Sequence, residues 1–306
     1  MERYSSYNDK FAQVAQKLDP QSRLLRAWKL EGGISAQVTA LEIEQPGEQT
    51  RKVLVRQHGA ADLARNPRIA ADEFRLLRLL RAEGVAAPEP YLLDQSGEIF
   101  STPYIVIEYI EGASEFAPPY LPDFLQQMAA HLARIHRLDC AKLDVTFLPA
   151  MAERYTRGLK ERPARLDESL NEGKIRDVLE AAWPLPQRNP TALLHGDFWP
   201  GNLLWRDGQL VGIIDWEDAA LGDPLADLAN GRLEILWAFG RDAMQLFTRQ
   251  YQSMLKLDLT SLPYWDLCAA LRPISKAAEW AEWAADEQVM REGHRWFVEQ
   301  ALSSLA

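Results

Sequence analysis

The chain reads LHGDFWPGN from residue 194 to residue 202, and this stretch decides the fold. It is followed by LVGII, residues 210–214, which has the apolar character of a buried strand and ends at Asp215. A His, an Asp and an Asn therefore stand in fixed order on a loop, with a second carboxylate at the end of the next strand. Since so many residue types in this order between two strands are improbable by chance, the pattern is a strong indicator of function.

Phosphoryl transfer from a nucleotide requires this set of groups. Asp197 is the candidate catalytic residue, because its carboxylate can accept or orient the proton of an attacking hydroxyl. Asn202 and Asp215 are the candidate metal ligands, since Mg²⁺ prefers hard oxygen donors and completes its coordination with phosphate oxygens and water. For His195 we expect a scaffold role, in which the neutral imidazole hydrogen-bonds backbone groups of the loop.

Composition limits the classes of protein to which the chain can belong. It has 306 residues, 47% hydrophobic and 25% charged, which indicates a globular protein large enough for two packed domains. A formal net charge of −10 argues against binding to nucleic acid or to an anionic membrane and would attract a cationic small molecule, although acidity can also serve solubility alone. Cys140 and Cys268 are far apart and form no CxxC, so neither a disulfide framework nor a zinc site is indicated. Because no signal peptide or membrane-spanning stretch is found, we expect a cytoplasmic protein.

A β-rich first third precedes an α-rich remainder. Strands are expected at Leu24 to Leu30, Ala36 to Ile43, Val53 to Arg56, Tyr91 to Asp94 and Tyr104 to Glu108. The first three would form an antiparallel meander, followed by an amphipathic helix from Ala71 to Glu83. A short helix before them carries Phe11, Val14 and Leu18 on one face and would pack as a brace.

Two motifs carry a resemblance to a known family: HGDFWPGNLLW, residues 195–205, and IIDWEDAALGDPLADLA, residues 213–229. They resemble the aminoglycoside phosphotransferase and choline kinase group, within the protein-kinase-like fold. The resemblance implies an α+β, two-lobe architecture, with a small antiparallel β-sheet lobe at 1–110 that binds nucleotide. A larger, mainly helical lobe at 111–306 would carry the catalytic and acceptor-binding residues, with the nucleotide and Mg²⁺ between the lobes.

The implied reaction is Mg²⁺-dependent transfer of the γ-phosphate of ATP or GTP to a hydroxyl of a small molecule. A small acceptor is implied because Asp215 is followed by Trp216-Glu217, without the Gly that protein kinases have at this place. The chain would then be a small-molecule kinase similar to the aminoglycoside phosphotransferases.

The resemblance also implies nucleotide contacts in the first lobe. Arg56 stands where the family has a lysine that contacts the nucleotide phosphates; a guanidinium can grip phosphate bidentately, but its fork is larger than an ammonium. Glu73 is the expected ion-pair partner of Arg56, and a solvated helix face is the alternative. Ile34 and Ser35 would lend backbone N–H groups to a phosphate. Glu108 and Ile110 would bind the adenine through a main-chain carbonyl and amide, respectively.

Asp223 and Asp227, which follow the strand at residues 210–214, have more than one interpretation. The resemblance suggests that Asp223 or Asp227 braces the catalytic loop by accepting backbone hydrogen bonds. Capping of the following helix is an equal alternative for Asp223. Asp227 lies in an apolar turn and needs a partner if it is buried, which favours the bracing role.

Acceptor recognition is the least specific part of the sequence. Trp280 and Trp283 share a helix face beside acidic residues and would suit a cationic amine, but we favour core packing for this pair. The alternatives for function are a choline, ethanolamine, sugar or amino-acid kinase of the same fold, and a catalytically inactive nucleotide-binding regulatory protein. Only Arg56 motivates the regulatory protein, and the intact Asp197, Asn202 and Asp215 argue against it.

Overall fold

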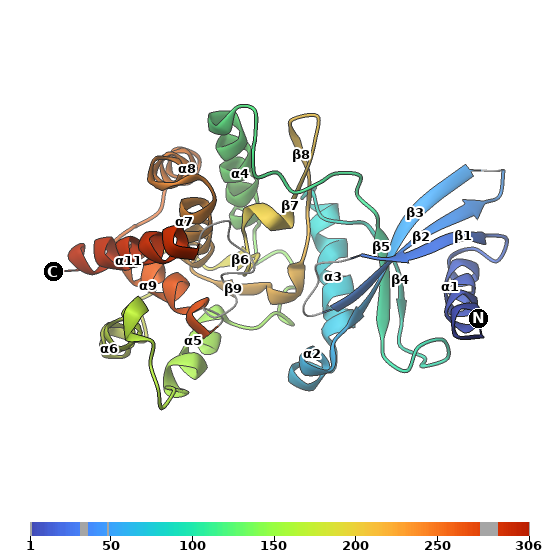
Figure 1. Cartoon of the computed structure of the whole chain (residues 1–306), viewed down its shortest axis with the longest axis horizontal. Coiled ribbons are helices and arrows are strands. Elements are labelled where there is room, and N and C mark those ends of the chain that lie inside the picture. Colours follow the sequence, from blue (N-terminus) through green and yellow to red (C-terminus); the bar gives the residue numbers. More distant parts are fainter. Residues whose placement is uncertain (1, 31–35, 48, 276–286, 306) are drawn as a thin grey trace. The chain divides into compact units, whose positions relative to one another are not determined.

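The computed structural model describes residues 2–30, 36–47, 49–275 and 287–305 (Figure 1). The chain folds into two compact units. The first unit comprises Met1–Glu111 together with Gly212–Glu217, and the second comprises Gly112–Val211 together with Asp218–Ala306. Six residues that follow the catalytic motif thus belong to the unit formed by the first third of the chain.

The first unit is built on one antiparallel sheet of five strands in the order β1-β2-β3-β5-β4. The strands are β1 (Arg23–Lys29), β2 (Ala36–Gln45), β3 (Gln49–His58), β4 (Pro90–Asp94) and β5 (Tyr104–Glu108). The helices of this unit are α1 (Glu2–Leu18), α2 (Ala60–Arg65) and α3 (Ile69–Ala82). All five predicted strands are present, and the predicted meander is β1-β2-β3.

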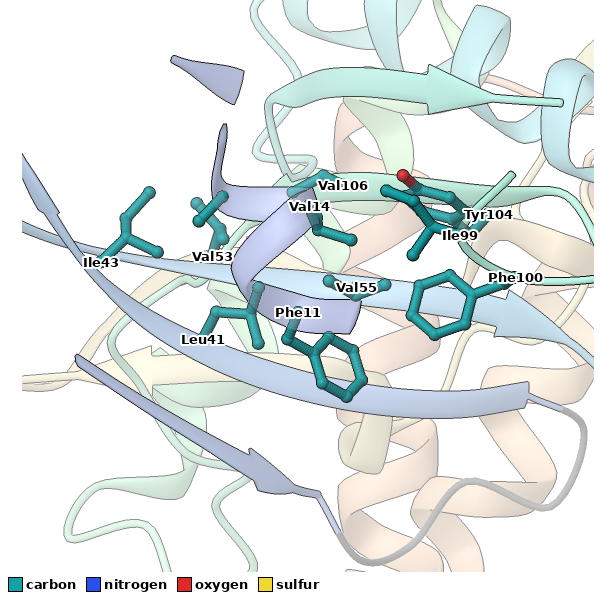
Figure 2. Packing of buried hydrophobic residues seen from close by; sticks show 11 residues of the cluster. Phe11, Val14, Leu41, Ile43, Val53, Val55, Ile99, Phe100, Tyr104 and Val106 are labelled. Atoms are coloured by element: carbon teal, nitrogen blue, oxygen red, sulfur yellow. The ribbon is translucent and has the colours of Figure 1, made fainter. Parts of the chain in front are cut away.

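Helix α1 packs against one face of this sheet, as expected for the N-terminal brace. Phe11 and Val14 of the helix are fully buried. Figure 2 shows them among side chains from the sheet and from the segment before β5: Leu41, Ile43, Val53, Val55, Ile99, Phe100, Tyr104 and Val106. Burying a large apolar side chain stabilises a fold by about 1.5–3 kcal/mol, so this cluster holds α1 in place.

The other face of the sheet receives helix α3, and α1 and α3 lie on opposite sides of the strands (Figure 1). Successive side chains of a strand point to opposite faces. Because Val53 and Val55 belong to the cluster under α1, Arg56 must point to the face that α3 covers. This alternation brings Arg56 to Glu73 on α3.

The second unit is mainly helical. Its helices are α4 (Leu121–His136), α5 (Met151–Lys160), α6 (Glu172–Ala182), α7 (Leu225–Phe239), α8 (Arg241–Met254), α9 (Leu262–Leu271) and α11 (Glu287–Ser303). Two small sheets frame the catalytic motif: β6 (Ala192–Leu194) pairs with β9 (Ala220–Gly222), and β7 (Leu203–Arg206) pairs with β8 (Gln209–Ile213). The motif loop therefore runs from the end of β6 to the start of β7.

In the described ranges of the chain, no helix is both long enough and apolar enough to cross a membrane. Both cysteines are free thiols.

Candidate active site

The loop between β6 and β7 places Asp197 and Asn202 together in the second unit. Residues Pro200–Asn202 form a 3₁₀ turn, which brings the Asn202 side chain back over the start of the loop. Its Nδ2 donates to the backbone carbonyl of Asp197 at 2.9 Å and to Asp197 Oδ2 at 3.2 Å. The amide orientation that these bonds require leaves Asn202 Oδ1, a hard oxygen donor, with no partner among the described residues.

His195 has the scaffold role that the sequence predicts. It is fully buried, and its Nδ1 accepts a hydrogen bond from the backbone N–H of Asp197 at 3.2 Å. The next residue, Gly196, has φ +83°, and a Cβ there would collide with the backbone carbonyl of Asp218. Only glycine adopts this positive φ without strain and has no Cβ to collide, so Gly196 fixes the direction in which the loop leaves β6.

Asp227 on α7 braces the loop, as the sequence favours. It is buried, and its carboxylate accepts hydrogen bonds from the backbone N–H groups of His195 at 2.6 Å and Gly196 at 2.9 Å. His136 Nε2 lies 3.2 Å from the same carboxylate. Burial alone would raise the pKa of the Asp227 carboxyl, but these donors lower it below its ordinary value, so the brace is a carboxylate at neutral pH.

Asp223 has a different role, at the start of α7. Its Oδ1 accepts from the backbone N–H of Leu225 at 3.0 Å and from Asn189 Nδ2 at 3.2 Å. Burial raises the pKa of its carboxyl above the ordinary value. Asp223 therefore binds the first N–H of α7 from one position before the N-cap residue, Pro224.

Two residues that the sequence did not single out lie beside Asp197 in the second unit. Arg272, directly after α9, donates from Nη2 to Asp197 Oδ1 at 3.2 Å. Glu234 on α7 is half-buried, and its burial, together with the negative charge of Asp197, raises its pKa to about 8. Arg272 is 75 residues from Asp197 in the sequence, so no local pattern connects them.

A cavity of about 880 Å³ opens next to the loop, within the second unit. Gly196 and Arg272 are part of its lining, so the cavity reaches the neighbours of Asp197. The rest of the wall combines apolar side chains such as Tyr155 and Leu271 with charged ones. This is the size and mixed character of a small-molecule site.

Asp215 lies in the first unit, two residues after the end of β8, with φ +66°. Its Oδ1 accepts from Arg56 Nη2 at 2.8 Å, and the same nitrogen donates to Glu217 Oε2 at 2.5 Å. Arg56 Nε donates to Glu73 Oε2 at 3.2 Å, which is the ion pair expected from the sequence. Arg56, considered above as a phosphate contact, therefore binds three carboxylates in this structure.

The acidic surroundings favour the charged form of Arg56. Burial alone would lower the pKa of the Arg56 guanidinium, but Glu73, Asp215 and Glu217 together raise it above its ordinary value. The sequence analysis did not predict Glu217 as a partner of Arg56, although Glu217 lies only two residues after Asp215. The second oxygen of Asp215 has no hydrogen-bond partner among the described residues, and its side chain is 35% exposed.

The remaining candidates concern the nucleotide and the acceptor. Glu108 is the last residue of β5, and Ile110 lies two residues beyond it, both in the first unit. Ile34 and Ser35 are outside the described residues, and so are Trp280 and Trp283.

Comparison with known families and structures identifies the chain. A family model described as the phosphotransferase enzyme family matches residues 28–271. The chain belongs to the phosphotransferase enzyme family. The match spans strands β2 to β5 of the first unit and both catalytic motifs, so the resemblance stated from the sequence is confirmed.

Solved structures show that this phosphotransferase has the expected fold. A putative aminoglycoside phosphotransferase from Ralstonia eutropha superposes with a TM-score of 0.69 at 15% identity, covering 97% of each chain. A GDP and kanamycin complex of an aminoglycoside phosphotransferase gives a TM-score of 0.65 at 17% identity over 96% of this chain and 98% of that one. A macrolide 2′-phosphotransferase from Brachybacterium faecium gives 0.62 at 17% identity over 95% and 98%. The protein-kinase-like fold, with an antiparallel sheet and a mainly helical part, is therefore confirmed.

Curated relatives match part of the phosphotransferase. Acyl-CoA dehydrogenase family member 10 of Mus musculus is 25% identical over 196 residues, 58% of this chain and 18% of its own length. Homoserine kinase of Phenylobacterium zucineum is 28% identical over 149 residues, 46% of this chain and 45% of its own. The chain thus spans about a fifth to a quarter of the first relatives and under half of the kinase.

Proposed function

We propose that this phosphotransferase moves the γ-phosphate of ATP or GTP to a hydroxyl of a small molecule in the presence of Mg²⁺. The observation that carries the proposal is the braced loop. Asp227 holds the backbone of residues 195 and 196, while Asn202 holds the backbone and carboxylate of Asp197. Positioning accounts for most of the catalysis of phosphoryl transfer, and this loop is built for positioning.

Asp197 is the catalytic residue in this proposal. Its carboxylate accepts the hydrogen bond of the acceptor hydroxyl, orients the oxygen for in-line attack and takes up the proton as the new O–P bond forms. Its neighbours Gly196 and Arg272 line a cavity of about 880 Å³, which would hold the small molecule.

Asn202 and Asp215 fit the chemistry of Mg²⁺. Each offers an oxygen that no described residue uses, and amide and carboxylate oxygens are ligands that this cation accepts. When bound, Mg²⁺ would neutralise the charge that develops on the phosphates. Arg56, already beside Asp215, would supply a fixed positive charge in the nucleotide-binding unit, and Glu73 would orient it.

Nucleotide recognition is assigned to the first unit, with backbone contacts at Ile34, Ser35, Glu108 and Ile110. The acceptor is assigned to the cavity of the second unit. Its described lining has four arginines and three acids, so the acidic composition of the whole chain is the main argument for a cationic acceptor. Antibiotics, amino alcohols, sugars and hydroxy amino acids all stay among the acceptors to be tested.

The test is turnover with a defined panel. The purified chain is incubated with Mg·ATP or Mg·GTP and with kanamycin, a macrolide, choline, ethanolamine, homoserine or a sugar, and the phosphorylated product is followed by ³¹P NMR. We expect acceptor-dependent product, and we expect Asp197→Asn to lower kcat by about 10²- to 10⁴-fold, the range of a lost general base. Nucleotide affinity measured by calorimetry should stay within about twofold of wild type, since the substitution leaves the nucleotide contacts in place.

Asp207→Asn is the matched control. Asp207 is an exposed carboxylate in the turn between β7 and β8, with φ +52°, which Asn tolerates, and its substitution should leave kcat unchanged. Full activity of Asp197→Asn would refute the catalytic assignment. Tight nucleotide binding without transfer to any acceptor would favour the inactive regulatory protein.

A further inference from the structure

Arg272 and Asn202 bind the two oxygens of one carboxylate. Arg272 Nη2 donates to Asp197 Oδ1 at 3.2 Å, and Asn202 Nδ2 donates to Asp197 Oδ2 at 3.2 Å. The χ2 torsion of an aspartate is broad and roughly two-fold, so the side chain has little orientational preference of its own. Arg272 and Asn202, two donors from different parts of the second unit, therefore both help to orient this carboxylate.

Asn230 on α7 holds Arg272 in turn. Its Oδ1 accepts from Arg272 Nη1 at 2.7 Å, and its Nδ2 donates to the backbone carbonyl of Phe198 at 3.3 Å. A guanidinium only donates and a carbonyl only accepts, so both partners demand the same orientation of this buried amide. Asn230 thus ties Arg272 to the backbone of the residue that follows Asp197.

The contact between Arg272 and Asp197 differs from a purely structural ion pair of the same unit. Arg232 and Asp266 form two parallel bonds of 3.0 Å, with side chains only 7% and 2% exposed. Arg272 and Asp197 form a single bond, and their side chains are 31% and 35% exposed. The carboxylate is therefore held by Arg272 and still partly exposed, and Arg272 itself lines the cavity.

Neighbouring groups favour the charged form of this guanidinium. Burial alone would lower the pKa of Arg272, but Tyr155, Asp197, Asp218 and Glu234 together raise it above its ordinary value. Arg272 thus stays positively charged, and it is one of the residues that line the cavity.

We propose that Arg272 is a positioning residue, which holds the Asp197 carboxylate in the one orientation that the acceptor hydroxyl requires. The proposal rests on the function proposed above. A carboxylate oxygen has two lone pairs, so Oδ1 can accept from Arg272 and from a hydroxyl at once. Since a misplacement of about 1 Å can cost about 10²-fold in rate, the loss of Arg272 should act on kcat.

The experiment compares Arg272→Ala, Arg272→Lys and the control Arg162→Ala. Arg162 is also in the second unit and 35% exposed, and it pairs with Asp177 at 2.8 Å, but it contacts neither the loop nor the cavity in the described residues. The kcat, the KM for the acceptor, the nucleotide Kd and the Tm are measured for each. Activity of Arg272→Ala is also measured with millimolar guanidine hydrochloride, and Asp197 is examined in crystal structures of wild type and Arg272→Ala.

We expect Arg272→Ala to lower kcat by about 10- to 100-fold with an unchanged nucleotide Kd. Added guanidinium should restore part of the activity and Arg272→Lys should retain part of it, which a merely structural role would not produce. Arg162→Ala should behave as wild type. In the crystal of Arg272→Ala, the Asp197 carboxylate should adopt more than one orientation.

Three results would overturn the proposal: a kcat within twofold of wild type, a loss confined to the acceptor KM, or a single, unchanged Asp197 orientation in Arg272→Ala. The confined KM effect would make Arg272 an acceptor contact instead. If wild type itself transfers phosphate to no acceptor, the proposed function fails, but the orientation of Asp197 in the two crystals still decides the role of Arg272.

Discussion

Replacing Asp227 by Asn removes the charge of the brace and one of its two acceptor oxygens, at nearly the same side-chain size. In the wild type, Oδ2 accepts from the backbone N–H of His195 and lies near His136, while Oδ1 accepts from Gly196. An amide has one acceptor oxygen and one NH₂ group, so one of the two backbone N–H groups must face another donor. Asp227→Asn therefore leaves a buried donor of the catalytic loop without an acceptor.

The size of the effect follows from these contacts. A buried unsatisfied donor costs about 1–3 kcal/mol, and hydrogen bonds to a charged acceptor contribute about 1.5–3 kcal/mol each. Because the amide oxygen recovers one bond, we expect a loss of about 3 kcal/mol. This corresponds to about 10²-fold less protection of the residue 195 and 196 amides, at 1.4 kcal/mol for each factor of ten, and to a fall in the urea midpoint of about 1 M.

The pH dependence gives a sharper check. The pKa of Asp227 is lowered in the folded state, so its contribution is present above the unfolded value of about 3.9 and is lost as pH falls through the folded pKa. The stability gap between wild type and Asp227→Asn should therefore be widest near pH 7 and shrink below about pH 4. Urea unfolding at several pH values and hydrogen exchange by mass spectrometry measure the gap.

Asp223→Asn is the control for this prediction. The hydrogen bonds from Leu225 and Asn189 both end on Oδ1 of Asp223, so an amide oxygen can accept them, and burial raises the pKa of this carboxyl. The loss of unfolding free energy in Asp223→Asn should be small and should not decrease at acid pH. A loss below about 0.5 kcal/mol for Asp227→Asn, or a gap that stays constant from pH 7 to pH 3, would refute the reasoning.

Two other substitutions test the charges around the proposed site. Burial and the charge of Asp197 raise the pKa of Glu234 to about 8, so its contribution to stability is full below about pH 4.3 and declines as pH rises towards 8. Glu234→Gln should therefore unfold at a higher temperature than wild type at pH 9 and at the same temperature near pH 4. An equal difference in unfolding temperature at both pH values would contradict this. Arg56→Lys should lower the free energy of unfolding by about 2–3 kcal/mol and weaken Mg·ATP binding, because an ammonium group cannot bind three carboxylates as the guanidinium does. The control Arg23→Lys, in the exposed pair of Arg23 with Glu44, should leave the stability measured by chemical denaturation unchanged.

Local patterns predicted most of the architecture. Short apolar runs indicated the five strands of the sheet, and the apolar stripe of Phe11 and Val14 predicted the brace under them. The loop motif led to Asp197 and Asn202, whose side chains meet, and the cost of burying an unpaired acid led to Asp227. Each of these predictions depends only on residues that are close together in the sequence.

The missed features depend on contacts between distant segments. Arg272 reaches Asp197 across 75 residues, and Glu217 reaches Arg56 across 161, so no spacing rule connects either pair. Helix α2, of six residues, is too short to show a period. Strand β9 has three residues and is recognisable only through its pairing with β6.

The segment Gly212–Glu217 has a practical consequence for anyone who wishes to divide this protein. A polypeptide that stopped at Glu111 would keep Arg56 under α3 but would leave it one carboxylate, Glu73, in place of three. It would also lack the strand-end N–H of Ile213 that bonds the carbonyl of Ala86. The first 111 residues thus do not contain the whole first unit. A chimaera or split version of the protein must also supply Gly212–Glu217 to complete that unit.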